Sequence, residues 1–372
     1  MDVVMDATVM MGLTIALVPV VGVLMALTPY LMKKSECFTI TVPESAASDP
    51  YLKGLKRRYL ALMLALTAAL TAAGVALVVL DNPSGVLAVV IAGTLLTCVI
   101  GYALMLYFRK KVSTYKKQRG WRAEAQEAVA VVGERDVPRA ISLKWNLLYV
   151  PVLLVTLGVG IAGYSNMPDM IPMQVGFDGE VSRWADKSLS IVFMPVLIQL
   201  FMIACFLFSH WNILRSKRLS EPGAPATSAL AYGMFARAQS IYLLAMGLVI
   251  CIALILMPLS FAGLVTLMQS AVVIMVVCIF IVVGGIAISV VYGQGGARLF
   301  ARMGESEEIL ADDDEHWKFG VFYVNRDDPS LFLPARFGVG WTFNYARPAI
   351  WAIMAAGLAI TIAFVVAVMS FG

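Results

Sequence analysis

The chain has 372 residues, of which 60% are hydrophobic and only 14% are charged, whereas about 25% of residues are charged in a typical soluble domain. A formal net charge of +4 is too small to indicate a nucleic-acid-binding protein. A large soluble core is excluded, because the chain contains long windows without charged residues and a membrane-spanning helix needs about 20 apolar residues. Eight windows qualify as spans: 7–32, 59–80, 86–108, 145–165, 189–211, 238–259, 264–292 and 349–371.

These windows predict an all-α polytopic membrane protein with about eight transmembrane helices. Pro19 and Pro29 fall in the first window and predict a kink there. We divide the chain into a three-helix segment with basic loops (1–144), a helix pair with a polar loop (145–211), two further helices (212–292), an acidic and aromatic segment (293–348) and a last helix (349–372).

The basic residues predict how the chain is oriented. Of the 28 Lys and Arg residues, 26 lie in the four segments 33–58, 109–144, 212–237 and 293–348. Loop 165–188 contains the other two, Arg183 and Lys187. Because Lys and Arg are retained on the cytoplasmic side, we expect a multi-pass cell-membrane protein with both termini extracytoplasmic. No basic residue precedes Lys33, so we expect the first helix to remain in the mature protein.

The outer loop 165–188 is a polar island between two apolar windows. Its segment from Pro168 to Ser188 contains two prolines, two glycines and six charged residues. Proline fixes φ and glycine permits positive φ, so we predict an ordered loop with turns. It is either a ligand-binding surface or a structural cap that joins two helices. Its candidate ligand-binding residues are Pro168, Asp169, Ile171, Pro172, Gln174, Phe177, Gly179, Trp184 and Lys187.

Segment 293–348 contains an acidic run and then an alternating aromatic stretch. The alternation predicts short strands, and we expect a small cytoplasmic β-hairpin-like element packed under the ends of the seventh and eighth helices. We interpret the acidic run, including Asp312, Asp313 and Asp314, as solvated rather than as a metal site. The candidate residues of this cytoplasmic motif are Trp317, Gly320, Tyr323, Asn325, Pro334, Arg336, Gly338, Gly340, Trp341 and Asn344.

The residue pattern favours neither catalysis nor a bound cofactor. No window has an ionisable residue at its centre, which argues against a proton-coupled pump. The glycines of segment 158–163 match Gly-x-Gly-x-x-Gly, but they lie inside an apolar window without the strand that a dinucleotide site requires. The five cysteines suit neither a disulfide framework nor a zinc site. We expect no enzyme activity, no cofactor, no metal and no nucleic-acid partner.

The outer loop resembles the external-loop motif of the SdpI-like bacterial membrane proteins. The resemblance is carried by Pro168, Ile171, Pro172, Gly179, Trp184, Lys187 and Ser188. Gln174 stands where the family motif has His, so a role that needs an ionisable imidazole does not carry over. The cytoplasmic motif resembles a C-terminal domain of unknown function that often accompanies the external-loop motif, through the patterns WKxGxFYxN (317–325) and PxRxGxGWTxN (334–344).

The first resemblance implies immunity or signalling against an extracellular antimicrobial peptide or a similar amphipathic ligand. The expected partners are the lipid bilayer, that peptide and a cytoplasmic regulator protein that would contact the inner segments, and of these only the peptide rests on the resemblance. Two alternatives remain. One is a transporter or flippase for an amphipathic small molecule or lipid, which a four-plus-four helix repeat would suit. The other is a scaffold in a membrane complex.

Overall fold

The computed structural model describes residues 7–121, 137–176, 181–217, 225–299, 313–337 and 340–370. Within these ranges, eight helical spans are long and apolar enough to cross a membrane, which confirms the predicted fold class. The helices are α1 (Ala7–Ile15), α2 (Leu17–Leu31), α3 (Pro50–Val79), α4 (Pro83–Arg119), α5 (Tyr149–Gly163), α6 (Leu189–Arg215), α7 (Pro225–Ala253), α8 (Leu256–Phe261), α9 (Leu267–Tyr292) and α11 (Pro348–Met369).

The first span is interrupted, as its prolines predict. Helices α1 and α2 meet at Ala16, three residues before Pro19. Proline has no N–H to donate, and its ring crowds the carbonyl four residues earlier, here that of Ile15. The hydrogen-bond ladder therefore breaks at this point, whereas Pro29 lies inside α2.

Helices α3 and α4 extend beyond their apolar windows into the basic loops. Asp49 caps α3, because its carboxylate accepts hydrogen bonds from the backbone N–H of Tyr51 at 2.7 Å and of Leu52 at 3.3 Å. Helix α4 has 37 residues and is therefore about 55 Å long, far more than the roughly 30 Å hydrocarbon core of a bilayer. Gly120 ends it in the left-handed conformation, with φ of 69°. The basic turns of both helices thus project past the hydrocarbon.

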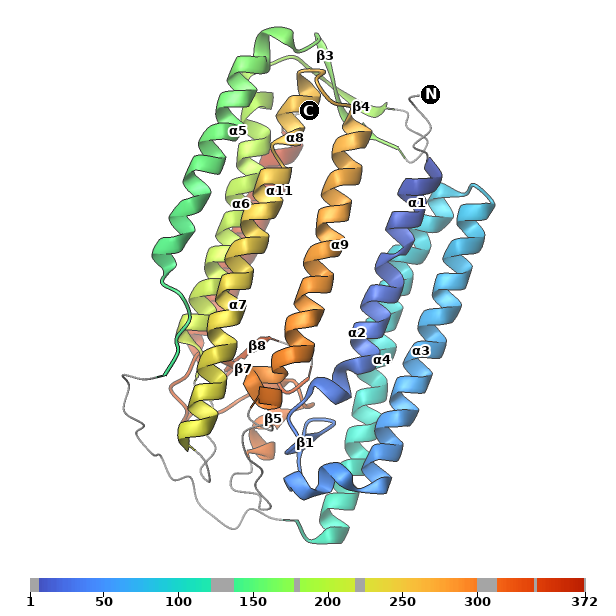
Figure 1. Cartoon of the computed structure of the whole chain (residues 1–372), viewed down its shortest axis with the longest axis vertical. Coiled ribbons are helices and arrows are strands. Elements are labelled where there is room, and N and C mark those ends of the chain that lie inside the picture. Colours follow the sequence, from blue (N-terminus) through green and yellow to red (C-terminus); the bar gives the residue numbers. More distant parts are fainter. Residues whose placement is uncertain are drawn as a thin grey trace.

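The spans form two groups (Figure 1). Helices α1 to α4 pack on one another, and α6 packs on α5 and α7 in the second group. Helix α9 stands between the groups, packed mainly on α7 and more lightly on α1 and α2. The division is therefore three spans against five, and the packing does not follow the four-plus-four repeat that the transporter alternative would suit.

Each described strand belongs to a two-stranded antiparallel hairpin. The β3–β4 hairpin lies at the end of the bundle where α1 begins and α11 ends (Figure 1). The other three lie at the opposite end, called here the basic end because the described parts of the four Lys- and Arg-rich segments lie there. The strands are β1 (Glu36–Cys37), β2 (Ile40–Thr41), β3 (Met170–Val175), β4 (Val181–Asp186), β5 (Trp317–Lys318), β6 (Phe322–Tyr323), β7 (Phe332–Pro334) and β8 (Trp341–Phe343).

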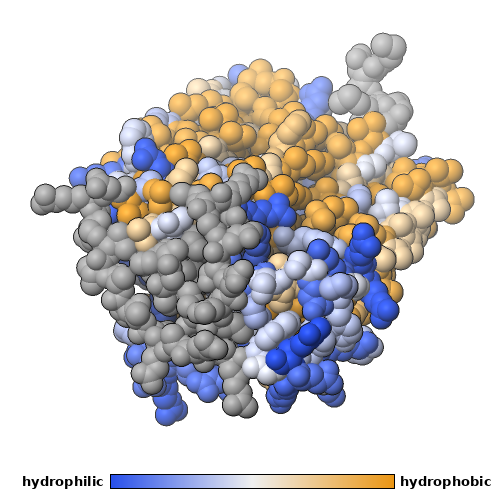
Figure 2. Space-filling view, turned by 60° about the horizontal axis from the view of Figure 1, so that its bottom comes forward, coloured by the Kyte–Doolittle hydropathy of each residue, from blue (hydrophilic) through white to orange (hydrophobic). Residues whose placement is uncertain are grey.

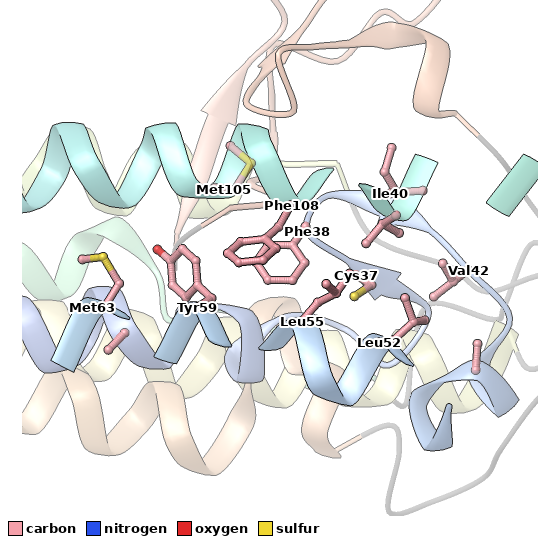
Figure 3. Packing of buried hydrophobic residues seen from close by; sticks show 13 residues of the cluster. Cys37, Phe38, Ile40, Val42, Leu52, Leu55, Tyr59, Met63, Met105 and Phe108 are labelled. Carbon is pink, nitrogen blue, oxygen red and sulfur yellow. The ribbon is translucent and has the colours of Figure 1, made fainter. Parts of the chain in front are cut away.

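A large apolar cluster lies where the β1–β2 hairpin meets α3 and α4 (Figure 3). The fully buried Phe38 stacks on Phe108, with ring centroids 5.1 Å apart, and meets the edge of Tyr59 at 5.6 Å. The β1–β2 hairpin is therefore anchored in the first helix group.

Polar residues cover much of the described surface at the basic end, and apolar residues dominate the helix surfaces behind it (Figure 2).

Candidate functional site

The outer loop forms the β3–β4 hairpin, and one face of it packs on the bundle. Ile171 pairs with Ala185 across the strands, and both side chains are buried in a cluster that includes Ile191 and Phe261. Ile171 is fully buried. It therefore supports the hairpin from beneath, and it is not placed to contact a ligand as the sequence analysis expected.

The opposite face of the hairpin is exposed. Trp184 pairs with Pro172 across the strands, and Met170 pairs with Asp186. Trp184 and Met170 are each 48% exposed, and Asp186 is exposed as well. Strand alternation produces this two-faced arrangement, because successive side chains of a strand point to opposite sides.

Lys187, directly after β4, contacts the main chain just before β3. Its Nζ donates hydrogen bonds to the carbonyls of Met167 at 2.7 Å and Ser165 at 3.4 Å, and it lies 5.0 Å from the centroid of the Tyr164 ring. The sequence analysis counts Lys187 among the candidate ligand-binding residues. Its contacts with main-chain carbonyls give it a structural role.

The remaining candidates of the outer loop are only partly placed. Pro168, Asp169 and Gln174 are exposed, and Gln174 pairs with Arg183 across the strands. The other two, Phe177 and Gly179, lie outside the described residues.

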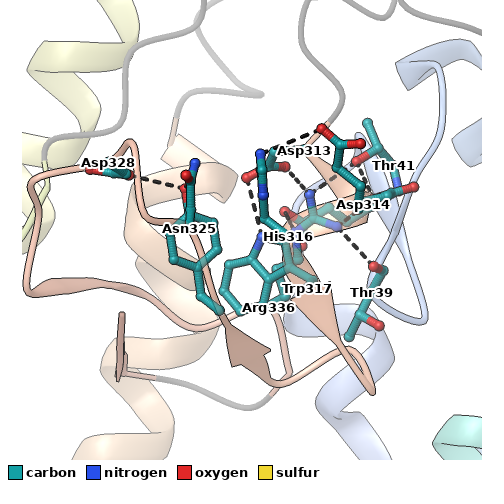
Figure 4. Close-up of polar contacts among 12 residues, drawn as sticks. Thr39, Thr41, Asp313, Asp314, His316, Trp317, Asn325, Asp328 and Arg336 are labelled. Carbon is teal, nitrogen blue, oxygen red and sulfur yellow. Dashed lines mark hydrogen bonds and ion pairs between the residues drawn. The ribbon is translucent and has the colours of Figure 1, made fainter. Parts of the chain in front are cut away.

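A second site, centred on Arg336, lies at the basic end (Figure 4). Arg336 is 5% exposed and forms ion pairs with Asp313 and Asp314. Its guanidinium also donates to the carbonyl oxygen of Thr39 at 2.9 Å and to Oγ1 of Thr41 at 3.2 Å. Arg336 therefore fastens the segment before α11 to the β1–β2 hairpin, almost 300 residues earlier in the chain.

Asp314 is the acidic centre of this network. Its carboxylate accepts from the backbone N–H of Thr41 at 3.1 Å, from Oγ1 of Thr41 at 2.8 Å and from Nζ of Lys116 at 2.8 Å. Burial alone would raise the pKa of Asp314, but Arg336 and Lys116 outweigh burial and lower it from 3.8 to about 2. Asp313 and Asp314 are therefore partners of buried cations, which corrects the solvated interpretation for these two residues. Asp312 lies outside the described residues.

The tip of the β1–β2 hairpin carries a strained backbone. Phe38 and Thr39 both have positive φ, 46° and 64°, a conformation that is rare for residues other than glycine. Arg109 of α4 donates to the carbonyl of Thr39 at 2.7 Å and to the carbonyl of Trp317 at 3.3 Å. Gly320 packs so closely on Thr39 that a Cβ there would overlap the Thr39 side chain. Strain held by surrounding contacts in this way clusters at functional sites.

The aromatic and amide residues of the motif in segment 293–348 complete the network. Trp317 lies under the Arg336 guanidinium at 5.0 Å and donates to Asp313 at 3.1 Å. Tyr323 donates to Asp328 at 3.0 Å, and that carboxylate also accepts from Lys217 at 2.8 Å. Lys217 follows the end of α6, so its contact with Asp328 ties the segment to that helix.

Two buried amides hold the rest of the segment. Asn344 donates to the carbonyls of Asn325 at 2.8 Å and Asp328 at 3.0 Å. Gln294, just after α9, donates to the carbonyls of Ala335 and Gly340. Of the last motif residues, Pro334 pairs with Trp341 across β7 and β8, and Gly338 lies outside the described residues.

We call the segment 313–347 the cap. Its β-hairpins confirm the predicted hairpin-like element. Its packing differs from the expectation, because it reaches past the ends of the seventh and eighth helices to β1–β2 and α4. Sequence reasoning missed Thr39, Thr41 and Lys116, and it missed Glu36, whose carboxylate lies 3.8 Å from Arg336. Arg109, which also joins the network, was marked in the sequence only as the first basic residue after an apolar window. Among the residues that the structure describes, none group as metal ligands.

Eight apolar spans, with one hairpin at one end and a cap at the other, define a multi-pass integral membrane protein. Residues 152–198, which contain most of α5, the β3–β4 hairpin and the start of α6, match a domain of unknown function (DUF1648). Residues 326–351 match a family of unknown function (DUF5808) and cover the second half of the cap. No curated protein and no solved structure matches the chain. The first match contains the outer-loop motif, and the second contains the PxRxGxGWTxN pattern (334–344) but not the WKxGxFYxN pattern (317–325).

Proposed function

We propose that the protein is an SdpI-like receptor or immunity protein that binds an amphipathic extracellular peptide on the exposed face of the β3–β4 hairpin. The two-faced hairpin is the observation that carries this proposal. Its exposed face combines two large apolar side chains, Trp184 and Met170, with the carboxylate of Asp186. Aromatic anchors supply much of the energy of peptide binding, and a carboxylate attracts a cationic ligand.

The fold supplies a route from this hairpin to the cap. Helix α9 contacts β3 at one end, and Gln294 follows its other end and holds the cap through Ala335 and Gly340. A ligand that shifts the hairpin would thereby bias the position of the cap. In this proposal a cytoplasmic regulator protein reads the cap, and no step requires catalysis.

The test compares two exposed tryptophans at opposite ends of the molecule. Trp184→Ala removes the hairpin aromatic, and Trp145→Ala removes one that is 56% exposed at the basic end. The probe is a fluorescent Leu/Lys amphipathic helical peptide titrated onto the protein in nanodiscs. We expect Trp184→Ala to weaken binding roughly 30-fold, as loss of about 2 kcal/mol at a binding hot spot would. Trp145→Ala should bind as the wild type does.

Two outcomes would contradict the receptor proposal. One is unchanged peptide binding by Trp184→Ala. The other is a loss of thermal stability that accompanies the loss of binding. The β3–β4 hairpin would then serve to hold α5 and α6 together and not to bind a ligand. Accumulation of the peptide inside proteoliposomes would favour the transporter alternative instead.

A further inference from the structure

The loop between β5 and β6 exposes aromatic side chains at the basic end. Phe319 is 68% exposed and Phe322 is 43% exposed. Phe319 has a positive φ of 50° and is followed by Gly320 with φ of 75°. Burying a phenylalanine side chain gains about 1.5–3 kcal/mol relative to leaving it in water, so a tip with two exposed phenylalanines is favoured by an apolar surrounding.

The height of this tip along the bundle follows from its contacts with α4. Tyr102 of α4 donates from its hydroxyl to the carbonyl of Phe319 at 3.3 Å. Tyr102 precedes Arg109 by seven positions, which is about 10 Å along a helix. Arg109 lies beside Gly320 of the same tip, so the tip lies between the levels of Tyr102 and the first basic residue of α4.

Helix α3 fixes the same level independently. Tyr59 donates to the carbonyl of Gly101 at 3.3 Å, so it places the start of the α3 apolar window beside Tyr102. The residues just before it, Arg57 and Arg58, are exposed. The change from charged to apolar surface on α3 thus occurs at the level of the β5–β6 tip.

An aromatic chain joins the tip to the first turn of α11. Phe322 meets Tyr345 edge to face at 5.3 Å, and Tyr345 meets Trp351 at 6.0 Å. Nε1 of Trp351 also donates to the carbonyl of Tyr345 at 3.1 Å. Trp351 is 56% exposed at the start of a spanning helix, where indole rings favour the membrane–water interface.

We propose that the β5–β6 tip is a wedge inserted into the bilayer at the basic end, with Phe319 and Phe322 at the boundary between headgroups and acyl chains. The depth set by Tyr102 and Tyr59 and the link to an interfacial tryptophan select lipid as the occupant. Aromatic side chains are enriched at this boundary. Because Gly320 packs on Thr39 beside Arg109, the bilayer then contacts the network that positions the cap.

The test measures the depth of a nitroxide on the cap. Spin labels are attached at Phe319→Cys, at Phe322→Cys and, as a matched control, at Asp327→Cys, which is exposed in the same cap. Cys98→Ala and Cys205→Ala remove the exposed native thiols. Collision rates with oxygen, which partitions into lipid, and with a nickel chelate, which stays in water, are compared in nanodiscs.

We expect labels at 319 and 322 to show a several-fold higher oxygen-to-nickel ratio than the label at 327. Phe322→Cys keeps the test decisive if the unusual backbone at 319 does not tolerate substitution. Equal ratios at all three positions would place the tip in water and overturn the proposal. Protection of 319 and 322 from both reagents would also overturn it, because a second copy of the chain or a soluble protein would then cover the tip.

Discussion

Arg336 gives the sharpest test of how the cap is held. Arg336→Ala removes a side chain whose atoms are 6% exposed and which pairs with both Asp313 and Asp314. The same change at Arg326, an exposed residue of the same cap, is the matched control. Both substitutions remove one positive charge, and only the first removes a buried one.

The expected magnitude follows from the contacts that are lost. Breaking a buried ion pair by removing one partner costs about 3–5 kcal/mol, because the remaining charge is left uncompensated. Lys116 still contacts Asp314 at 2.8 Å, which favours the lower part of that range. Surface substitutions change stability by about 0.5 kcal/mol or less, so Arg326→Ala should have almost no effect.

Hydrogen–deuterium exchange of the cap in nanodiscs measures this difference. The backbone N–H of Val324 donates to the carbonyl of His316 at 2.9 Å within the cap, and exchange requires such bonds to open. A loss of about 3–5 kcal/mol corresponds to exchange roughly a hundred- to a few thousand-fold faster. Arg336→Lys keeps the charge but loses the planar fork, so it should fall between the wild type and Arg336→Ala.

The pH dependence checks the same reasoning. The folded-state pKa of Asp314, about 2, lies below its ordinary value of 3.8. This carboxylate therefore stabilises the cap above pH 3.8, and its contribution is lost as the pH falls toward 2. In Arg336→Ala the loss should begin at higher pH, because the main cation beside Asp314 is gone. An increase in exchange of less than tenfold in Arg336→Ala, or an equal increase in Arg326→Ala, would refute the reasoning.

Three further predictions concern the cap and the orientation of the chain. Burial raises the pKa of Glu36 above 4.5 although the Arg336 guanidinium, 3.8 Å away, opposes the shift. Its ionised form therefore destabilises the fold at neutral pH, and Glu36→Gln should stabilise the cap by about 1 kcal/mol and slow its exchange. The gain should vanish below pH 4.5, and faster exchange at neutral pH, as expected if the contact with Arg336 dominates, would contradict the prediction. Gly320→Ala should destabilise the cap by about 1–3 kcal/mol, because Gly320 has a positive φ and a Cβ there would overlap Thr39. Gly357→Ala is the control, since a Cβ there meets no atom within 4 Å and should change the thermal midpoint little. Equal changes in the thermal midpoint of the two variants would argue against this. An impermeant maleimide added to intact cells should label Ser370→Cys but not Lys53→Cys, both exposed at opposite ends of the bundle; the reverse result would invert the proposed orientation.

The sequence predicted the spans well because the signal for a transmembrane helix is local. Each apolar window is long enough by itself to make transfer into lipid favourable, and Pro19 breaks the first span through a contact with its own helix. The outer loop and the cap were also found, since proline, glycine and alternating aromatics report on the nearby backbone. Their residue types identified segments, and they did not identify the partners of those segments.

The roles of individual side chains needed the tertiary structure. Ile171 and Trp184 are both apolar residues of one loop, and only the register of β3 with β4 buries the first and exposes the second. Nothing near Arg336 in the chain indicates a partner at Thr39. The two residues meet only because the packing of α3 and α4 places the β1–β2 hairpin beside the cap. Composition thus determined that the chain enters the membrane and where it crosses. Which charges meet at the basic end was decided by helix packing, since a buried ion pair forms only when the whole fold removes both partners from water.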